Sequence, residues 1–189
     1  MTRLPPAILP AIPPATDAWL VTGIPGAGKS TISRVLAGRF RRGAHLEGDR
    51  LGDMIVGGLV HPGQAPREES DRQSLLVINH LCLLARSFAR SGFTPVLDYV
   101  CMTRGGVARY RRSLARLNLH LVVLNPGKDT ALARDLARPE KTVAVHWTHL
   151  EDVMRRELPG LGLWIDSRDQ TPEQTVAHIL RHRKKALVP

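Results

Sequence analysis

Apolar and polar positions alternate along the chain in two distinct patterns. Five short, mostly apolar runs are typical of strands buried inside a parallel sheet, and the clearest is residues 119–124. Longer stretches between these runs carry apolar residues at helical spacing, as in residues 31–40. The expected strands span residues 18–21, 44–49, 93–98, 119–124 and 163–166. This alternation predicts an α/β fold with a five-stranded parallel sheet and helices on both faces.

The helical segments differ in how strongly they are marked. The segment at residues 67–90 is apolar on nearly every side between Leu75 and Leu84, which predicts a substantially buried helix ending at Gly92. The last helix begins at residues 171–174 with an N-cap Thr, a Pro at N1 and a capping-box Gln. The expected helices are residues 31–40, 50–56, 67–90, 105–117, 129–137, 143–158 and a last one from 171.

Length and composition indicate one soluble domain. The 189 residues suit a single domain over residues 17–185, preceded by a proline-rich tail at residues 1–16. No apolar run approaches the length of a membrane span, and the prolines of the tail interrupt any signal-peptide helix. Cys82 and Cys101 lack metal-ligand spacing and are too few for a disulfide framework. A cytoplasmic protein is therefore expected.

A complete phosphate-binding pattern lies between the first strand and the first helix. Residues 23–30 read Gly-Ile-Pro-Gly-Ala-Gly-Lys-Ser, which matches G-x-x-x-x-G-K-[ST]. At such a junction, backbone amides converge on phosphate oxygens at the positive end of the helix dipole. Lys29 is expected to reach the β- and γ-phosphates, and the Ser30 hydroxyl to ligate Mg²⁺. With ATP and Mg²⁺ as cofactors, the expected binding residues are Gly23, Gly26, Ala27, Gly28, Lys29, Ser30 and Thr31.

Carboxylates follow the second and third strands, where the carboxyl ends of parallel strands form the floor of such sites. Asp49 is the candidate base for an attacking hydroxyl, and its alternative role is to cap the helix that follows. Glu47 points to the same side of the strand and is a rival base. Asp98 is the candidate magnesium ligand together with Ser30, and its alternative role is to cap the next turn.

Basic residues after the fourth strand are candidates for a lid over the phosphates. Arg134 and Arg138 are spaced i, i+4, so one helical face can present both guanidinium groups to a transferring phosphoryl group. Together with Asp49 and Lys29 they are the catalytic candidates, in a lid at residues 134–141. The alternative is a surface pair bridged by neighbouring carboxylates. Five further residues are candidates for the acceptor pocket, and core packing is their alternative role: Tyr99, Arg104, Arg109, Tyr110 and Trp147.

The net charge of +10 raises the question of a nucleic-acid partner. Arginines appear in scattered doublets, and residues 181–185, Arg-His-Arg-Lys-Lys, form the one dense cluster. This distribution favours an ordinary solvated basic face. A small-molecule hydroxyl acceptor is therefore favoured over a nucleic acid, and the sequence leaves the oligomeric state open.

With these motifs, residues 19–180 resemble the small P-loop kinases, in particular the chloramphenicol phosphotransferase-like and zeta-toxin-like branch of the nucleoside-monophosphate-kinase superfamily. The resemblance rests on residues 23–31, on Asp49 and Asp98, and on the lid arginines. It implies a three-layer P-loop NTPase fold with the third strand beside the first. It also implies that Asp49 activates an acceptor hydroxyl and that the lid arginines clamp ATP.

The expected function is ATP-dependent transfer of the γ-phosphate to a hydroxyl of a small molecule, such as an antibiotic or another natural product. The alternatives are a 5′-hydroxyl polynucleotide kinase and a P-loop ATPase or switch protein. The long apolar helix at residues 67–90 departs from the family pattern on the acceptor side. Chloramphenicol itself is therefore not implied as the acceptor.

Overall fold

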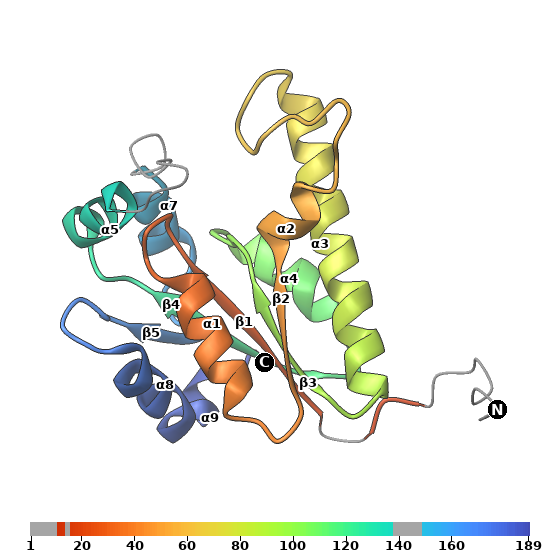
Figure 1. The fold of residues 1–189 in the computed structure, drawn as a ribbon, viewed down its shortest axis with the longest axis vertical. Helices are drawn as coiled ribbons and strands as arrows, with labels where there is room; N and C mark the ends of the chain where they lie inside the picture. Colours follow the sequence, from red (N-terminus) through yellow and green to blue (C-terminus); the bar gives the residue numbers. More distant parts are fainter. Residues whose placement is uncertain (1–10, 14–15, 138–148) are drawn as a thin grey trace.

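Five parallel strands form one sheet in the computed structural model, which describes residues 11–13, 16–137 and 149–189. The strand order is β2-β3-β1-β4-β5 (Figure 1). This order places β3 beside β1 and confirms the predicted α/β fold with its five-stranded parallel sheet. The strands are β1 Asp17–Gly23, β2 Gly43–Glu47, β3 Thr94–Asp98, β4 Asn118–Leu124 and β5 Leu163–Ile165.

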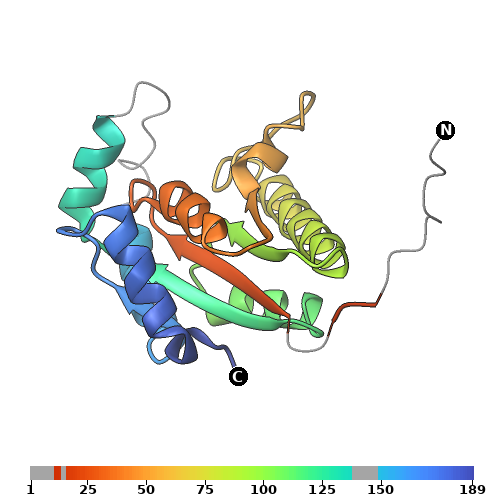
Figure 2. The same ribbon diagram turned by 60° about the horizontal axis from the view of Figure 1, so that its bottom comes forward.

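Helices cover both faces of this sheet. Helix α1 packs against α8 on one face, and α4 lies on the opposite face from α1 (Figure 2). Helix α3 packs on β2, β3 and α4. The helices in the described residues are α1 Lys29–Gly38, α2 Gly48–Gly52, α3 Arg67–Arg90, α4 Arg104–Ser113, α5 Lys128–Leu136, α7 His149–Glu157, α8 Pro172–Arg181 and α9 Arg183–Ala186.

The centre of the core is the β1–β4 pair. The two strands are aligned from Asp17 opposite Asn118 to Gly23 opposite Leu124. Residues 18–21 and 121–124 have at most 1% of their surface exposed, as expected for strands covered on both faces. Each large apolar side chain buried in this way contributes about 1.5–3 kcal/mol. Because the strands are parallel and in register, their carboxyl ends meet along one edge.

Helix α3 is less buried than its sequence predicts. A stripe with helical spacing, comprising Val77, Leu81, Ala85 and Ala89, faces the protein interior, with at most 4% exposed. The leucines on its other faces are 36–60% exposed, so the prediction of a substantially buried helix is wrong. One helix packed on one side of a sheet can bury only one stripe. No helix in the described residues, α3 included, is both long and apolar enough to cross a bilayer.

Local signals at helix ends are mostly confirmed. Thr171 caps α8, Pro172 occupies its first turn, and Gln174 completes the capping box. Gly92 follows α3 with a positive φ of 78°. The second strand, however, ends at Glu47, and the following residues already form α2. The expected strand 44–49 is therefore two residues too long, and the expected helix at 50–56 starts and ends too late.

Candidate functional site

The phosphate-binding loop connects β1 to α1 at the carboxyl edge of the sheet. Its chain leaves β1 at Gly23 and enters the helix at Lys29. The first hydrogen bond of α1 runs from Ile32 N to Gly28 O at 3.0 Å. The amides of residues 29–31 therefore precede the helical hydrogen bonds and open toward the helix N-terminus. There the helix dipole favours an anion.

The predicted binding residues of this loop differ in their hydrogen bonds and in their exposure. Lys29 folds back, and its Nζ donates to Ile24 O at 3.3 Å. The amide of Ala27 also donates to Ile24 O, at 3.1 Å, and Ala27 is 1% exposed. Ala27 thus closes the loop from inside instead of presenting its own N–H. Ser30 is half-buried and Thr31 is exposed at the start of the helix.

Two glycines are required by the loop for different reasons. Gly26 has a φ of 79°, and a Cβ built there would overlap the carbonyl oxygen of Ala131 in α5. Gly28 has a φ of 92°, but a Cβ there would meet no atom within 4 Å. The first glycine therefore lets the loop touch α5 closely, whereas the second supplies only a left-handed backbone conformation.

Asp98 ends β3, between Val21 of β1 and Glu47 of β2 in the sheet register. Its side chain is 3% exposed, and its Oδ2 lies 3.3 Å from His45 Nε2. A buried carboxylate oxygen on the strand beside the loop suits Mg²⁺, as does the Ser30 hydroxyl, because Mg²⁺ prefers oxygen ligands. The described residues contain no cluster of three or more His, Cys, Asp or Glu able to hold a metal. Few protein ligands are typical of Mg²⁺ that is bound mainly by phosphates and water.

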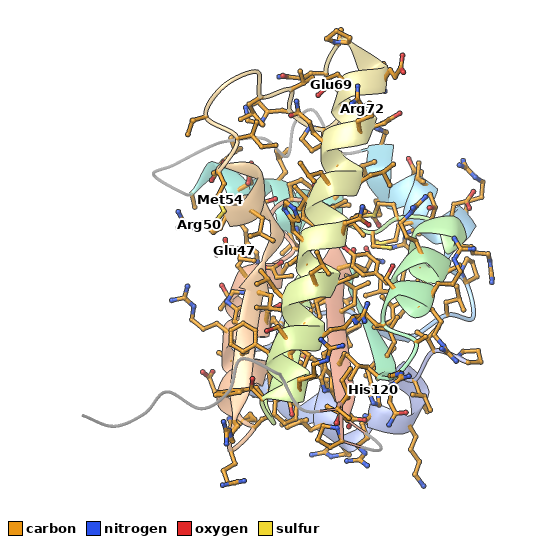
Figure 3. All side chains as sticks on the ribbon, turned by 90° about the vertical axis from the view of Figure 1, so that its right-hand side faces the viewer. Glu47, Arg50, Met54, Glu69, Arg72 and His120 are labelled. Atoms are coloured by element: carbon orange, nitrogen blue, oxygen red, sulfur yellow. The ribbon has the colours of Figure 1, made fainter. Side chains whose placement is uncertain are left out.

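The two rival carboxylates occupy different elements. Asp49 lies in the first turn of α2 and is exposed to solvent. The residue at the N-cap position of α2 is Glu47, so the alternative role of Asp49 as the cap of this helix is wrong. Glu47 is at the end of β2, and Arg50 Nε lies 3.6 Å from its Oε2. Figure 3 shows Glu47 and Arg50 close together at the same level of the fold.

A tyrosine after β3 touches the segment that carries Asp49. A Cβ built on Gly48 would overlap the ring of Tyr99, so the first turn of α2 packs directly on this ring. Burial and then the nearby negative charge of Asp49 raise the pKa of Tyr99 to about 12, against a hydrogen bond with Ser74 that lowers it. Tyr99 therefore keeps its proton at neutral pH and lies beside the candidate base.

The lid candidates are only partly within the described residues. Arg134 of α5 donates through its NH2 group to the carbonyl oxygens of Ser167, at 2.9 Å, and Arg168, at 3.1 Å. Its guanidinium thus binds the loop between β5 and α8. Arg138 and Trp147 lie outside the described residues, and so does half of the predicted lid, residues 138–141. The spacing argument for an arginine pair stays a prediction.

A hollow of about 360 Å³ lies along the outer edge of β2. Side chains from β2, α1, α2 and α3 line it, among them His45, Glu47 and Arg50. Asp49 is not part of its wall. Glu47 is therefore accessible from this side, which keeps it in competition with Asp49.

Comparison with known proteins places the chain in a family. A family model described as an AAA domain matches residues 19–159. The chain belongs to this family. No curated protein matches it in sequence.

Solved structures resemble this AAA-domain chain over nearly its whole length. A sugar kinase from Janibacter sp. HTCC2649 is 18% identical, with a TM-score of 0.67 over 90% of this chain and 96% of that chain. A tunicamycin resistance protein from Deinococcus radiodurans is 16% identical, with a TM-score of 0.62 over 92% and 99%. The Mycobacterium tuberculosis APS kinase in complex with AMPPNP and APS is 16% identical, with a TM-score of 0.63 over 91% and 99%. At these identities the likeness establishes the shared fold.

The sequence analysis did not identify two side chains at the site of this AAA-domain chain. His45 contacts Asp98, and the Thr22 hydroxyl accepts from Cys101 N at 2.8 Å, tying β1 to the chain after β3. Positions 45 and 47 alternate with 46 on one face of β2, so period-2 spacing indicates that His45 shares a face with Glu47. Its contact with Asp98 needs the strand order as well.

Proposed function

We propose that the protein is an ATP-dependent phosphotransferase that moves the γ-phosphate of ATP to a hydroxyl group of a small molecule. One observation carries the proposal: the phosphate-binding loop, the buried Asp98 and the exposed Asp49 occur at the same edge of the sheet. A phosphate loop alone suits an ATPase or a switch. A carboxylate beside it, accessible to solvent, suits transfer to a hydroxyl. The resemblance to a sugar kinase and to an APS kinase supports the same class.

The loop supplies the binding of the nucleotide phosphates. The amides at the start of α1 donate to phosphate oxygens, and Lys29 exchanges the Ile24 carbonyl for a phosphate oxygen. Ser30 and Asp98 are the residues that would hold Mg²⁺, which when bound neutralises charge developing on the phosphates. His45 keeps the Asp98 carboxylate in place through their 3.3 Å contact.

Asp49 acts on the acceptor in this proposal. Its carboxylate takes the proton of the attacking hydroxyl as the hydroxyl oxygen bonds to the γ-phosphorus, while the bond from that phosphorus to the β–γ bridging oxygen breaks and ADP leaves. Tyr99 is a positioning residue, because its ring supports Gly48 and its phenol remains protonated next to Asp49. The engagement of Glu47 with Arg50, at 3.6 Å, makes Glu47 the second choice of base.

The acceptor is small and is not a polyanion. Glu47 and Asp49 both lie on the acceptor side, and their negative charges disfavour the approach of a phosphate backbone. The basic cluster at residues 181–185 lies beyond the end of α8, whose N-terminus follows the carboxyl end of β5. It is therefore at the opposite edge of the sheet and cannot line this site.

The arginine lid is part of the proposal. Arg134 fixes the loop between β5 and α8 through the carbonyl oxygens of Ser167 and Arg168. Arg138, one helical turn later in sequence, is the arginine that we propose for the transferring phosphate. In this proposal Arg134 holds the loop between β5 and α8, and Arg138 acts on the transferring phosphate.

A matched pair of isosteric variants tests the proposal. ATP consumption is measured with purified protein and a panel of hydroxylated small molecules that includes sugars and antibiotics. With an accepted substrate, Asp49→Asn should lower kcat by about 10²-fold or more while leaving ATP affinity nearly unchanged. Glu47→Gln is the control and should retain most of the activity. A fully active Asp49→Asn with an inactive Glu47→Gln would identify Glu47 as the base.

A further inference from the structure

The amino-terminal edge of the sheet, opposite the phosphate loop, carries an unusual concentration of cations. Strand starts are aligned there, as Asp17 with Asn118 and Gly43 with Thr94. Helices α1, α3, α4 and α8 end at this edge, and His120 marks this lower end in Figure 3. Helix α7 ends short of it, because β5 begins opposite Val122, in the middle of β4. We call it the basic edge; its residues are Arg39, Arg41, Arg42, Arg90, Arg111, Arg112, Arg116, Arg181, Arg183, Lys184 and Lys185.

The basic edge accounts for the whole net charge of the protein. In the part of the chain that the structure describes, it holds 11 of the 24 lysines and arginines but only one of the 16 acidic residues, Asp17. Of the 27 basic and 17 acidic residues of the full sequence, 16 of each therefore remain outside the basic edge, and this remainder is neutral. The Asp17 carboxylate already has a hydrogen-bond partner, since its Oδ1 accepts from Asn118 Nδ2 at 3.1 Å.

The cations of the basic edge are not neutralised within the fold. None of them forms an ion pair with an acidic side chain in the part of the chain that the structure describes. Elsewhere, basic side chains do pair with carboxylates, as Arg72 with Glu69 and Arg168 with Asp166. Nine of the eleven are exposed, and Arg90 and Arg111 are half-buried. Arg111 Nε donates to the carbonyl oxygen of Pro189 at 3.3 Å. Clustered like charges that lack acidic partners attract an anionic partner from solution.

The dimensions and side chains of the edge distinguish between polyanions. Four strands, β2, β3, β1 and β4, start at this edge, and at about 4.8 Å apart they make it about 14 Å wide. Duplex nucleic acid presents a phosphate roughly every 3.4 Å on each strand along such an edge. Arginine predominates, and its planar fork matches phosphate oxygens. Arg42 already lies over the Phe93 ring, 4.4 Å from its centroid, which orients its guanidinium. Among the exposed large apolar side chains of the described residues, only Leu187 is near this edge, whereas membrane binding normally uses an apolar face as well.

We propose that the basic edge binds the phosphate backbone of nucleic acid. The contacts are to phosphates, so binding does not depend on base sequence. The phosphotransfer site is at the other edge, so the bound nucleic acid is not the phosphoryl acceptor. This inference stands independently of the proposed function.

A charge-matched pair of triple variants tests it. The edge variant combines Arg41→Gln, Arg116→Gln and Lys184→Gln, one from each of three segments of the basic edge. The control variant combines Arg67→Gln, Arg72→Gln and Arg156→Gln, which are exposed and lie outside the edge. Both lose three positive charges, so their net charges match and the charges are removed at different places. The control variant also loses the ion pairs of Arg72 with Glu69 and of Arg156 with Glu157. Binding of a labelled 20-base-pair RNA duplex is measured by anisotropy between 50 and 200 mM salt, with anionic phosphatidylserine vesicles in parallel.

The wild-type protein should bind the duplex with log K falling linearly against log salt, with a slope of about −4 for four to five phosphate contacts. The edge variant should bind at least about tenfold more weakly, with a slope shallower by about 2–3, while the control changes little. Equal weakening by both variants would overturn the proposal, since net charge alone would then explain binding. So would a slope near zero, or binding to vesicles without binding to the duplex. Circular dichroism of each variant establishes that the fold is retained.

Discussion

The contact between the phosphate loop and α5 can be tested with two glycines that differ in one respect. Gly26 and Gly28 both have positive φ, of 79° and 92°. Only at Gly26 does an added Cβ overlap another backbone atom, the carbonyl oxygen of Ala131. Gly28→Ala therefore tests the backbone conformation alone. Gly26→Ala tests the conformation and the close approach together.

The expected losses in the free energy of unfolding follow from two effects, the left-handed backbone conformation and the overlap with α5. A left-handed conformation costs an L-residue about 1–2 kcal/mol, so Gly28→Ala should lower the free energy of unfolding by about that amount. Gly26→Ala should cost roughly 1–3 kcal/mol more, because the loop and α5 must separate to admit the methyl group. Backbone atoms cannot rotate away as a flexible side chain can. The larger loss is therefore unavoidable if the packing is as the structure shows.

Equilibrium denaturation in urea, without nucleotide, measures both free energies of unfolding. Gly38→Ala serves as a further control, since Gly38 ends α1 without positive φ and a Cβ there meets nothing within 4 Å. This control should be neutral or slightly stabilising. If Gly26→Ala and Gly28→Ala agree within about 0.5 kcal/mol, the close contact between loop and α5 does not exist and the reasoning fails.

Two further predictions follow from the site. Lys29→Ala should abolish ATP-dependent turnover but leave the circular dichroism spectrum unchanged, because Lys29 is a half-buried residue of the loop and not part of the apolar core; unchanged turnover would remove the basis for a phosphate-binding role. The pKa of Tyr99 is raised from 10.0 to about 12, so the stability that the protonated phenol provides is present below pH 10 and is lost as the pH rises toward 12. Between pH 10 and 11.5 the free energy of unfolding of the wild type should therefore fall further than that of Tyr99→Phe, by up to about 2 kcal/mol. Urea denaturation of both proteins measures this difference.

Short-range patterns in the sequence were sufficient for much of this architecture. The buried strand at residues 119–124 and the loop at residues 23–30 are each defined within a few neighbouring residues, and both lie where predicted. The cap of α8 is equally local, because Thr171 and Gln174 bond to each other's backbone amides. Such features depend on backbone geometry that the nearby residues determine by themselves.

Features that depend on distant partners were not predictable in the same way. The exposure of Leu76 and Leu83 follows from how much of α3 the sheet can cover, which the apolar composition of the helix does not reveal. The contact between His45 and Asp98 joins residues that are 53 positions apart. The packing of Gly48 in α2 on the Tyr99 ring likewise joins residues that are far apart in sequence, and a Cβ at position 48 would overlap this ring.

The two edges of the sheet can act separately because salt screens one from the other. Strand β1 has seven residues, so its ends are about 20 Å apart. This distance is more than twice the screening length of about 8 Å at physiological ionic strength. Phosphates held at the basic edge therefore have little electrostatic effect on Asp49 or Asp98 at the other end. At low salt the screening length approaches the strand length, and the two edges become coupled. Binding of a polyanion would then weaken the attraction of the protein for the phosphates of ATP, because it neutralises the net charge of +10.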